Sequence, residues 1–265
     1  MKHLASTLWL LSALVLFCGC GGGGTSTSAP PPQPLNIAGN WQFGTESTVH
    51  GEPLGIAGSI NQSGSAVSGT VHVSSFFEYC FDPLTTMGLT GALSGNNISL
   101  TSASVDGQVI TFTGRITDNA LTGTYTITGG CADGDQGNVA GTRVPSITGQ
   151  LDGTFTSSGN ETFDAVAQMT QGSASTEGSF GITGTVTFSA SCLNSGTIKS
   201  GTFPSGSFIM GTSVALEIET DNGTVAFHGT ANPATNEIRG DYTVLGGTCD
   251  QTGTAVLAAS SPWDY

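Results

Sequence analysis

Positive charge is scarce in this sequence. Its 265 residues include only 5 Lys and Arg against 19 Asp and Glu, which gives a formal net charge of -14 at pH 7. A chain of this charge repels phosphate backbones and anionic lipid headgroups. The sequence therefore predicts that nucleic acid is not a partner.

Motifs for catalysis and cofactor binding are also missing. We find no G-x-S-x-G elbow, no paired catalytic carboxylates and no phosphate-binding loop, and the 4 His do not cluster with carboxylates as a zinc site requires. A loop with Asp133, Asp135 and Asn138 offers oxygen ligands for calcium, but it lacks the distal Glu of an EF-hand, so we interpret it as a polar turn. We expect no cofactor, no metal and no catalytic residue, and a hydrolase is the weakest of the functions considered.

Long hydrophobic runs are limited to Leu4 to Phe17, about 14 residues, which is too short to span a bilayer. Lys2 precedes this run, and a small residue, Gly19, precedes Cys20. This order resembles a bacterial lipoprotein export signal, with residues 1–19 as the signal peptide and Cys20 as the lipidated cysteine. The resemblance implies a palmitoylated protein held on the membrane of the cell envelope by its N-terminal lipid. Because Gly21 and not Asp follows Cys20, we expect the outer rather than the inner membrane.

The segment after the expected lipidation site is rich in glycine and proline, GGGGTSTSAPPPQP from Gly21 to Pro34. Such a composition cannot bury a hydrophobic core. We therefore interpret residues 20–35 as a flexible, lipid-anchored tether.

The rest of the chain repeats itself. SGTVHV at 68–73 matches TGTVTF at 183–188, and TGTYTITGGC at 122–131 matches RGDYTVLGGTC at 239–249. A period of about 110 residues is too long for a solenoid repeat and suits a duplicated domain. We place the two domains at 36–144 and 147–265.

Residues of alternating polarity predict eight strands in the first domain and give no helical pattern. In one segment, Leu121, Tyr125 and Ile127 form an apolar face, and the threonines between them form the polar face. The strands span about 40–47, 55–62, 66–74, 87–94, 97–105, 108–117, 120–128 and 137–144. Glycines on the inward face let a sheet curve tightly. The sequence therefore predicts an all-β protein of two tandem eight-stranded antiparallel up-and-down barrels, with two-sheet β-sandwiches as the alternative.

Four cysteines follow the export signal, and an even number in an exported chain favours disulfides. In an up-and-down meander the connections after strands 3 and 7 lie at the same end, and these contain Cys80 and Cys131. We therefore predict a Cys80–Cys131 disulfide. By the repeat, Cys192 pairs with Cys249.

Gly39-Asn40-Trp41 opens the first predicted strand, and Arg143 ends the eighth. This pair resembles the calycin and lipocalin pattern, in which a G-x-W motif packs against an Arg of the last strand at the closed end of the barrel. The resemblance implies structural roles for Trp41 and Arg143, with the guanidinium over the indole. Our alignment puts Leu151 and Ala255 at the corresponding positions of the second domain.

The main aromatic concentration lies in the long connection after strand 3 and comprises Phe76, Phe77, Tyr79 and Phe81. We interpret this segment either as a lid that binds a small hydrophobic ligand or as a plug that fills the barrel mouth. The expected function is a non-catalytic binding or structural module of the cell envelope, whose partner is a small hydrophobic ligand or an envelope protein. The alternative is a surface module that recognises glycans or proteins.

Overall fold

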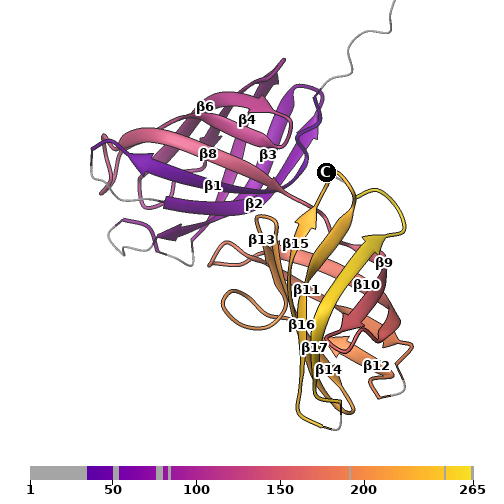
Figure 1. Ribbon diagram of the computed structural model, residues 1–265. Helices are drawn as coiled ribbons and strands as arrows, with labels where there is room; N and C mark the ends of the chain where they lie inside the picture. The colour runs from indigo at the N-terminus through magenta and orange to yellow at the C-terminus, as the bar shows by residue number, and fades with distance from the viewer. Residues whose placement is uncertain are drawn as a thin grey trace, which may run out of the picture. The chain divides into compact units, whose positions relative to one another are not determined.

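The computed structural model describes residues 35–49, 54–75, 80–82, 85–190, 192–247 and 249–263. Within these ranges every regular element is a β-strand (Figure 1). None of the described segments is a helix long and apolar enough to cross a membrane.

The first eight strands close into one barrel, here called barrel 1. They are β1 (Gly39–Ser47), β2 (Leu54–Ser63), β3 (Ala66–Ser75), β4 (Thr86–Ser94), β5 (Asn97–Ser102), β6 (Val109–Thr117), β7 (Ala120–Thr128) and β8 (Gln136–Val144). Each pairs antiparallel with the next, and β8 returns to β1, with Trp41 opposite Arg143. The predicted up-and-down barrel is confirmed, with strand ends close to those expected.

Alternating polarity decides which residues face the interior of barrel 1. On β7, Leu121, Tyr125 and Ile127 are buried, whereas Thr122 and Thr124 are exposed. The inward side chains join one hydrophobic core that also contains residues of the other strands. The predicted faces of this strand are confirmed.

The remaining strands form barrel 2. They are β9 (Gly149–Ser157), β10 (Thr162–Ala174), β11 (Phe180–Phe188), β12 (Ser195–Ile198), β13 (Phe208–Met210), β14 (Ser213–Thr220), β15 (Gly223–Asn232), β16 (Glu237–Leu245) and β17 (Gln251–Ala259). β17 pairs with β9, and β10 pairs with β11, so this sheet closes as well. A barrel, and not a sandwich, is the architecture of both repeats.

Barrel 2 has nine strand segments where eight strands were expected. β12 and β13 both lie between β11 and β14 and together occupy one position of the wall. The segment 199–207 interrupts this position and includes a small antiparallel bridge between Thr202 and Ser205. The predicted eight-stranded barrel is therefore confirmed for barrel 2 as well, with an insertion that divides its fourth wall position into two short strands.

Ser207 restores the hydrogen bonding of the wall at this interruption. Its backbone nitrogen donates to the carbonyl of Lys199 at 2.9 Å. Its hydroxyl oxygen accepts from the backbone nitrogen of Glu217 at 2.8 Å. Since Ser207 is fully buried, these bonds hold the two short strands in one continuous wall.

Candidate functional site

The two ends of each barrel differ in their connections. In barrel 1 the connections 64–65, 95–96 and 118–119 are short, and the chain enters β1 at this end, here called the tether end. The connections that follow β1, β3, β5 and β7 lie at the opposite end, here called the disulfide end. Barrel 2 also has a disulfide end, formed by the connections after β9, β11, β14 and β16.

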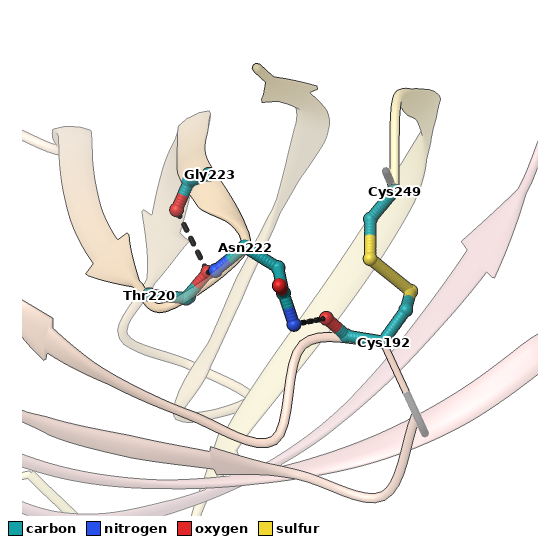
Figure 2. The surroundings of a disulfide bond; sticks show 5 residues. All are labelled: Cys192, Thr220, Asn222, Gly223 and Cys249. Atoms are coloured by element: carbon teal, nitrogen blue, oxygen red, sulfur yellow. Dashed lines mark hydrogen bonds between the residues drawn. A yellow bond between two sulfur atoms is a disulfide. The ribbon is translucent and has the colours of Figure 1, made fainter. Parts of the chain in front are cut away.

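Both predicted disulfides are present. Cys80 and Cys131 are joined with their Cα atoms 5.5 Å apart. Cys192 and Cys249 are joined with their Cα atoms 5.9 Å apart (Figure 2). Each bond ties the connection after the third strand of its barrel to the last connection at the same end.

A side-chain amide supports each disulfide from a third connection. In barrel 1, Gln108 donates to the carbonyl of Cys80 at 2.6 Å and accepts from the backbone nitrogen of Ala132 at 2.9 Å. In barrel 2, Asn222 donates to the carbonyl of Cys192 at 2.7 Å (Figure 2). The duplication has therefore kept an amide at this place, and three connections of each disulfide end are linked.

The candidate ligand-binding segment of barrel 1 is only partly described. Phe76, Phe77 and Tyr79 lie outside the described residues, so their role stays a prediction. Phe81 is buried and belongs to the hydrophobic core of barrel 1. The ring next to Cys80 therefore packs into the barrel.

At this end of barrel 1, the buried carboxylate of Asp135, just before β8, binds side chains of β1 and β7. Asp135 Oδ2 accepts from the hydroxyl of Tyr125 at 2.8 Å, and its Oδ1 accepts from the hydroxyl of Ser47 at 2.5 Å. Asp135 and Tyr125 are both buried. Burial, together with the hydrogen bond to Asp135, raises the pKa of Tyr125 to about 12. The Tyr125 hydroxyl therefore stays protonated at neutral pH and can donate a hydrogen bond.

The residues considered for calcium do not converge. Asp133 accepts from the backbone nitrogen of Gly129 at 2.6 Å, Asp135 is directed inward to its hydroxyl partners, and Asn138 is exposed on β8. Across the described ranges, no three His, Cys, Asp or Glu side chains are grouped as a metal site. His72 and His228 are on the outer wall, since neither is buried.

Described side chains of five strands pack closely in the interior of barrel 1. A cavity of about 10 Å³ is enclosed by five apolar residues, Phe43, Leu89, Leu100, Phe112 and Leu121. This volume is at the lower limit for one water molecule. An eight-stranded barrel is only just wide enough to be filled in this way.

Register identifies the corresponding residues of barrel 2. Tyr125 and Ser47 both lie opposite Gly137, and Tyr242 and Ser157 both lie opposite Gly253. The residue two positions before this glycine is Asp135 in barrel 1 and Gln251 in barrel 2, so Gln251 takes the place of Asp135. Counting two residues forward, Phe155 takes the place of Thr45. Barrel 2 has therefore kept the tyrosine and lost the carboxylate that binds it.

Tyr242 consequently lies in an apolar setting. Its ring contacts Phe155 and Phe163, with centroids 5.0 and 6.1 Å away, and Phe188 contacts Phe155 at 5.5 Å. The hydroxyl of Tyr242 is buried and has no hydrogen-bond partner in the described part of the chain. Burial raises the pKa of this tyrosine above its usual value.

Trp41 and Arg143 meet at the tether end. They are directly opposite each other on β1 and β8, so their side chains share one face. The indole nitrogen donates to the carbonyl of Ile37 at 2.8 Å, and the guanidinium donates to the carbonyls of Asn36 and Ala38. The pair thus fixes the chain segment that leads from the expected tether into barrel 1.

The alignment of this pair onto barrel 2 needs a correction. Leu151 lies opposite Ala259, whereas Ala255 lies opposite Phe155. The residue that corresponds to Arg143 is therefore Ala259 and not Ala255. The repeat spacing differs between the first and last strands, and only the strand register reveals this shift.

Sequence reasoning missed Ser47, Gln108, Tyr242 and Asn222 as parts of the disulfide ends. Asp135 was considered only as a turn residue or calcium ligand. The repeat carried a usable signal, because the alignment of Tyr125 with Tyr242 marks one inward tyrosine per barrel. The difference between Asp135 and Gln251 then follows from the residues before Gly137 and Gly253.

Comparison with known proteins adds little to this description. No family model and no curated protein matches the chain. Among solved structures, kievitone hydratase from Nectria haematococca is similar at 11% identity and a TM-score of 0.22, over 86% of this chain and 91% of that one. A protein of Nitrosomonas europaea named AttH is similar at 10% identity and a TM-score of 0.21, over 88% and 99%. The barrel assignment rests on the strand pairings of this chain alone.

Proposed function

We propose that the protein is a lipid-anchored, non-catalytic module of the bacterial cell envelope, in which barrel 1 is a filled scaffold and binding takes place at the barrel ends and outer walls. The anchor is Cys20, and the membrane is its partner through the lipid. Outer-membrane sorting is part of this proposal, because Gly21 follows the anchor.

The observation that carries the proposal is the close packing of the described side chains inside barrel 1. A cavity of about 10 Å³ is far below the roughly 300 Å³ of a typical small-molecule pocket. Phe81, the Cys80–Cys131 disulfide and the Tyr125–Asp135 bond all close the same end. These features favour the plug over the ligand-binding lid for the segment that contains Phe77 and Tyr79.

The test combines two substitutions in this segment, Phe77→Ala and Tyr79→Ala. A plug loses stability, so the melting temperature of barrel 1 falls while binding of a neutral apolar dye is unchanged. Weaker dye binding at an unchanged melting temperature would contradict the scaffold function and support the interpretation of this segment as a ligand-binding lid. Labelling of the native protein by serine- or cysteine-directed activity probes would contradict the non-catalytic part.

A second candidate function, recognition by the outer wall, is favoured by the inserted segment of barrel 2. Phe203 is 48% exposed and packs edge-on against Phe208 at 5.7 Å. These two residues line a groove of about 500 Å³ together with Met210 and His228. Glycan or protein binding that survives the Phe77 and Tyr79 substitutions and is lost in Phe203→Ser would support this function.

A further inference from the structure

A hollow of about 840 Å³ lies between the outer wall of barrel 1 and a face of barrel 2 that is formed by the inserted segment and two turns. Both barrels belong to one compact unit of the chain. The volume is within the range of roughly 300 to 1,000 Å³ that is typical of small-molecule pockets. The hollow therefore has room for a ligand, unlike the small cavity inside barrel 1.

The part of the barrel 1 wall that lines this hollow is made of very small residues. Gly44 of β1 lies opposite Gly55 of β2 and Ala140 of β8, and all three line the hollow. A Cβ atom added at Gly44 would meet no other atom within 4 Å. On β7, by contrast, exposed threonines cover the outer wall. Gly44, Gly55 and Ala140 thus form a recess in the wall, here called the Gly44 recess.

The barrel 2 side of the hollow carries apolar side chains that the protein leaves exposed. Phe203 and Met210 are 48% and 41% exposed, and both line the hollow together with Pro204. The backbone nitrogen of Phe203 donates to the hydroxyl of Ser179, a fully buried residue, at 3.0 Å. This bond fixes the place of the aromatic residue. A ligand that covers these apolar groups removes them from water, which favours binding.

One side chain links the two sides of the hollow. Gln42 lies on the outer wall of barrel 1 and lines the hollow. Its Nε2 donates to the carbonyl of Gly178, and its Oε1 accepts from the backbone nitrogen of Gly211 at 2.5 Å. Because both partners are backbone groups of barrel 2, this amide holds the Gly44 recess and the apolar side chains at a defined separation.

Charge defines which ligands suit the hollow. Glu177, in the turn between β10 and β11, is the one charged side chain among the described residues that line it. This side chain is exposed. A hydrogen bond with the Thr176 side chain lowers the pKa of Glu177 below its usual value, so the carboxylate is negative at neutral pH. A cationic ligand is therefore attracted, and an anionic ligand is repelled.

We propose that this hollow binds a small hydrophobic molecule that carries one positively charged ammonium group. The apolar body of the ligand lies between the Gly44 recess and the side chains of Phe203 and Met210, and the ammonium group lies near Glu177. The site rests on the proposed function, which places binding at the outer walls. It needs neither the Phe77 and Tyr79 segment nor space inside barrel 1.

The experiment compares three probes with the same phenylbutyl body on the full-length protein at neutral pH, with Kd values from ligand-observed NMR. 4-Phenylbutylamine is a cation, 4-phenylbutanol is uncharged and 4-phenylbutanoate is an anion, and we expect the Kd to rise in this order. In Glu177→Gln, the Kd of the amine rises about two- to fivefold, the value of an exposed ion pair, while the Kd of the alcohol is unchanged. An unchanged Kd of the amine would overturn the proposal.

A second variant blocks the hollow itself. Gly44→Phe places a ring in the recess, and we expect binding of all three probes to be lost. Gly88→Phe is the matched control and leaves binding unchanged, because Gly88 is an exposed glycine of β4 that also has space for a Cβ atom but does not line the hollow. If the melting temperature shows that Gly44→Phe does not fold, Ala140→Phe fills the same recess from β8.

Three results would overturn the site in distinguishable ways. The first is that the wild type shows no saturable binding of the amine, or that a folded blocking variant binds it equally well; the scaffold function then stands. The second is binding that survives Gly44→Phe and is lost in Phe203→Ser, which places the probe in the groove of the second candidate function. The third is binding that survives Gly44→Phe and is lost in the Phe77→Ala, Tyr79→Ala variant, which overturns the scaffold function as well.

Discussion

The phenolic oxygen of Tyr125 lies 2.8 Å from Oδ2 of Asp135, and both side chains are buried at the disulfide end of barrel 1. A buried carboxylate needs donors, since burial of an unpaired charge is costly. Tyr125 and Ser47 supply one donor to each oxygen. The bond joins β7 to the residue just before β8.

Replacement of Tyr125 by Phe removes one of these donors and leaves Asp135 with a single hydroxyl partner. We expect the free energy of unfolding to fall by about 1.5 to 3 kcal/mol, as for hydrogen bonds to charged groups. Urea unfolding of the purified, ligand-free protein measures this loss. Tyr242→Phe is the control, because its hydroxyl has no hydrogen-bond partner among the described residues, and an equal loss in that variant would refute the comparison.

Alkaline pH tests the same bond. The folded-state pKa of Tyr125 is raised from 10.0 to about 12, so the unfolded chain ionises first as pH rises. The stabilisation is complete below pH 10 and is lost as pH rises toward 12. Unfolding free energies measured across this range should fall more steeply for the wild type than for Tyr125→Phe. Parallel pH profiles for the two proteins would argue against a perturbed Tyr125.

Gln108 connects the two cysteine-bearing connections of barrel 1 through the carbonyl of Cys80 and the backbone nitrogen of Ala132. Gln108→Met keeps the length of the side chain but leaves both backbone groups without this partner. We expect the free energy of unfolding to fall by about 2 kcal/mol, since each of these part-buried backbone groups loses a hydrogen bond. Gln136→Met, at an exposed position of β8, is the matched control. Equal stability of the two variants in chemical denaturation would show that the amide link contributes nothing.

Ser207 should be sensitive to the loss of one oxygen atom. Ser207→Ala removes the acceptor of the Glu217 backbone nitrogen at the split position of barrel 2, and we expect about 1 to 2 kcal/mol of destabilisation. Ser205→Ala, two residues earlier and exposed, should be neutral. Hydrogen exchange of the Glu217 amide reports the effect directly, and unchanged protection in Ser207→Ala would contradict the role assigned to this hydroxyl.

The fold could be predicted from sequence because alternating polarity acts locally. On β7 the threonines face outward and Leu121, Tyr125 and Ile127 face inward, as the pattern alone required. The disulfides followed from the up-and-down topology, which puts Cys80 and Cys131 at one end. These inferences needed only the alternation of polarity along single strands and the rule that alternate connections of a meander lie at opposite ends of the barrel.

Other features depend on contacts between distant residues and were not predictable. The split of one wall position into β12 and β13 is stabilised by Ser207, whose hydroxyl bonds to Glu217 on a neighbouring strand. Asp135 looked like a turn residue because its partners, Ser47 and Tyr125, lie on other strands. The alignment of Ala255 with Arg143 was wrong by four residues, since similar local sequence does not fix the register of β17 against β9.

The central claim, that barrel 1 is a filled scaffold, is tested most directly by native mass spectrometry of the protein purified from the cell envelope. Wild type and the Phe77→Ala, Tyr79→Ala variant are compared, each with its N-terminal lipid. The account predicts the same non-covalent mass, or the same lack of one, on both proteins. A lipophile that accompanies the wild type and is missing from the variant would contradict it.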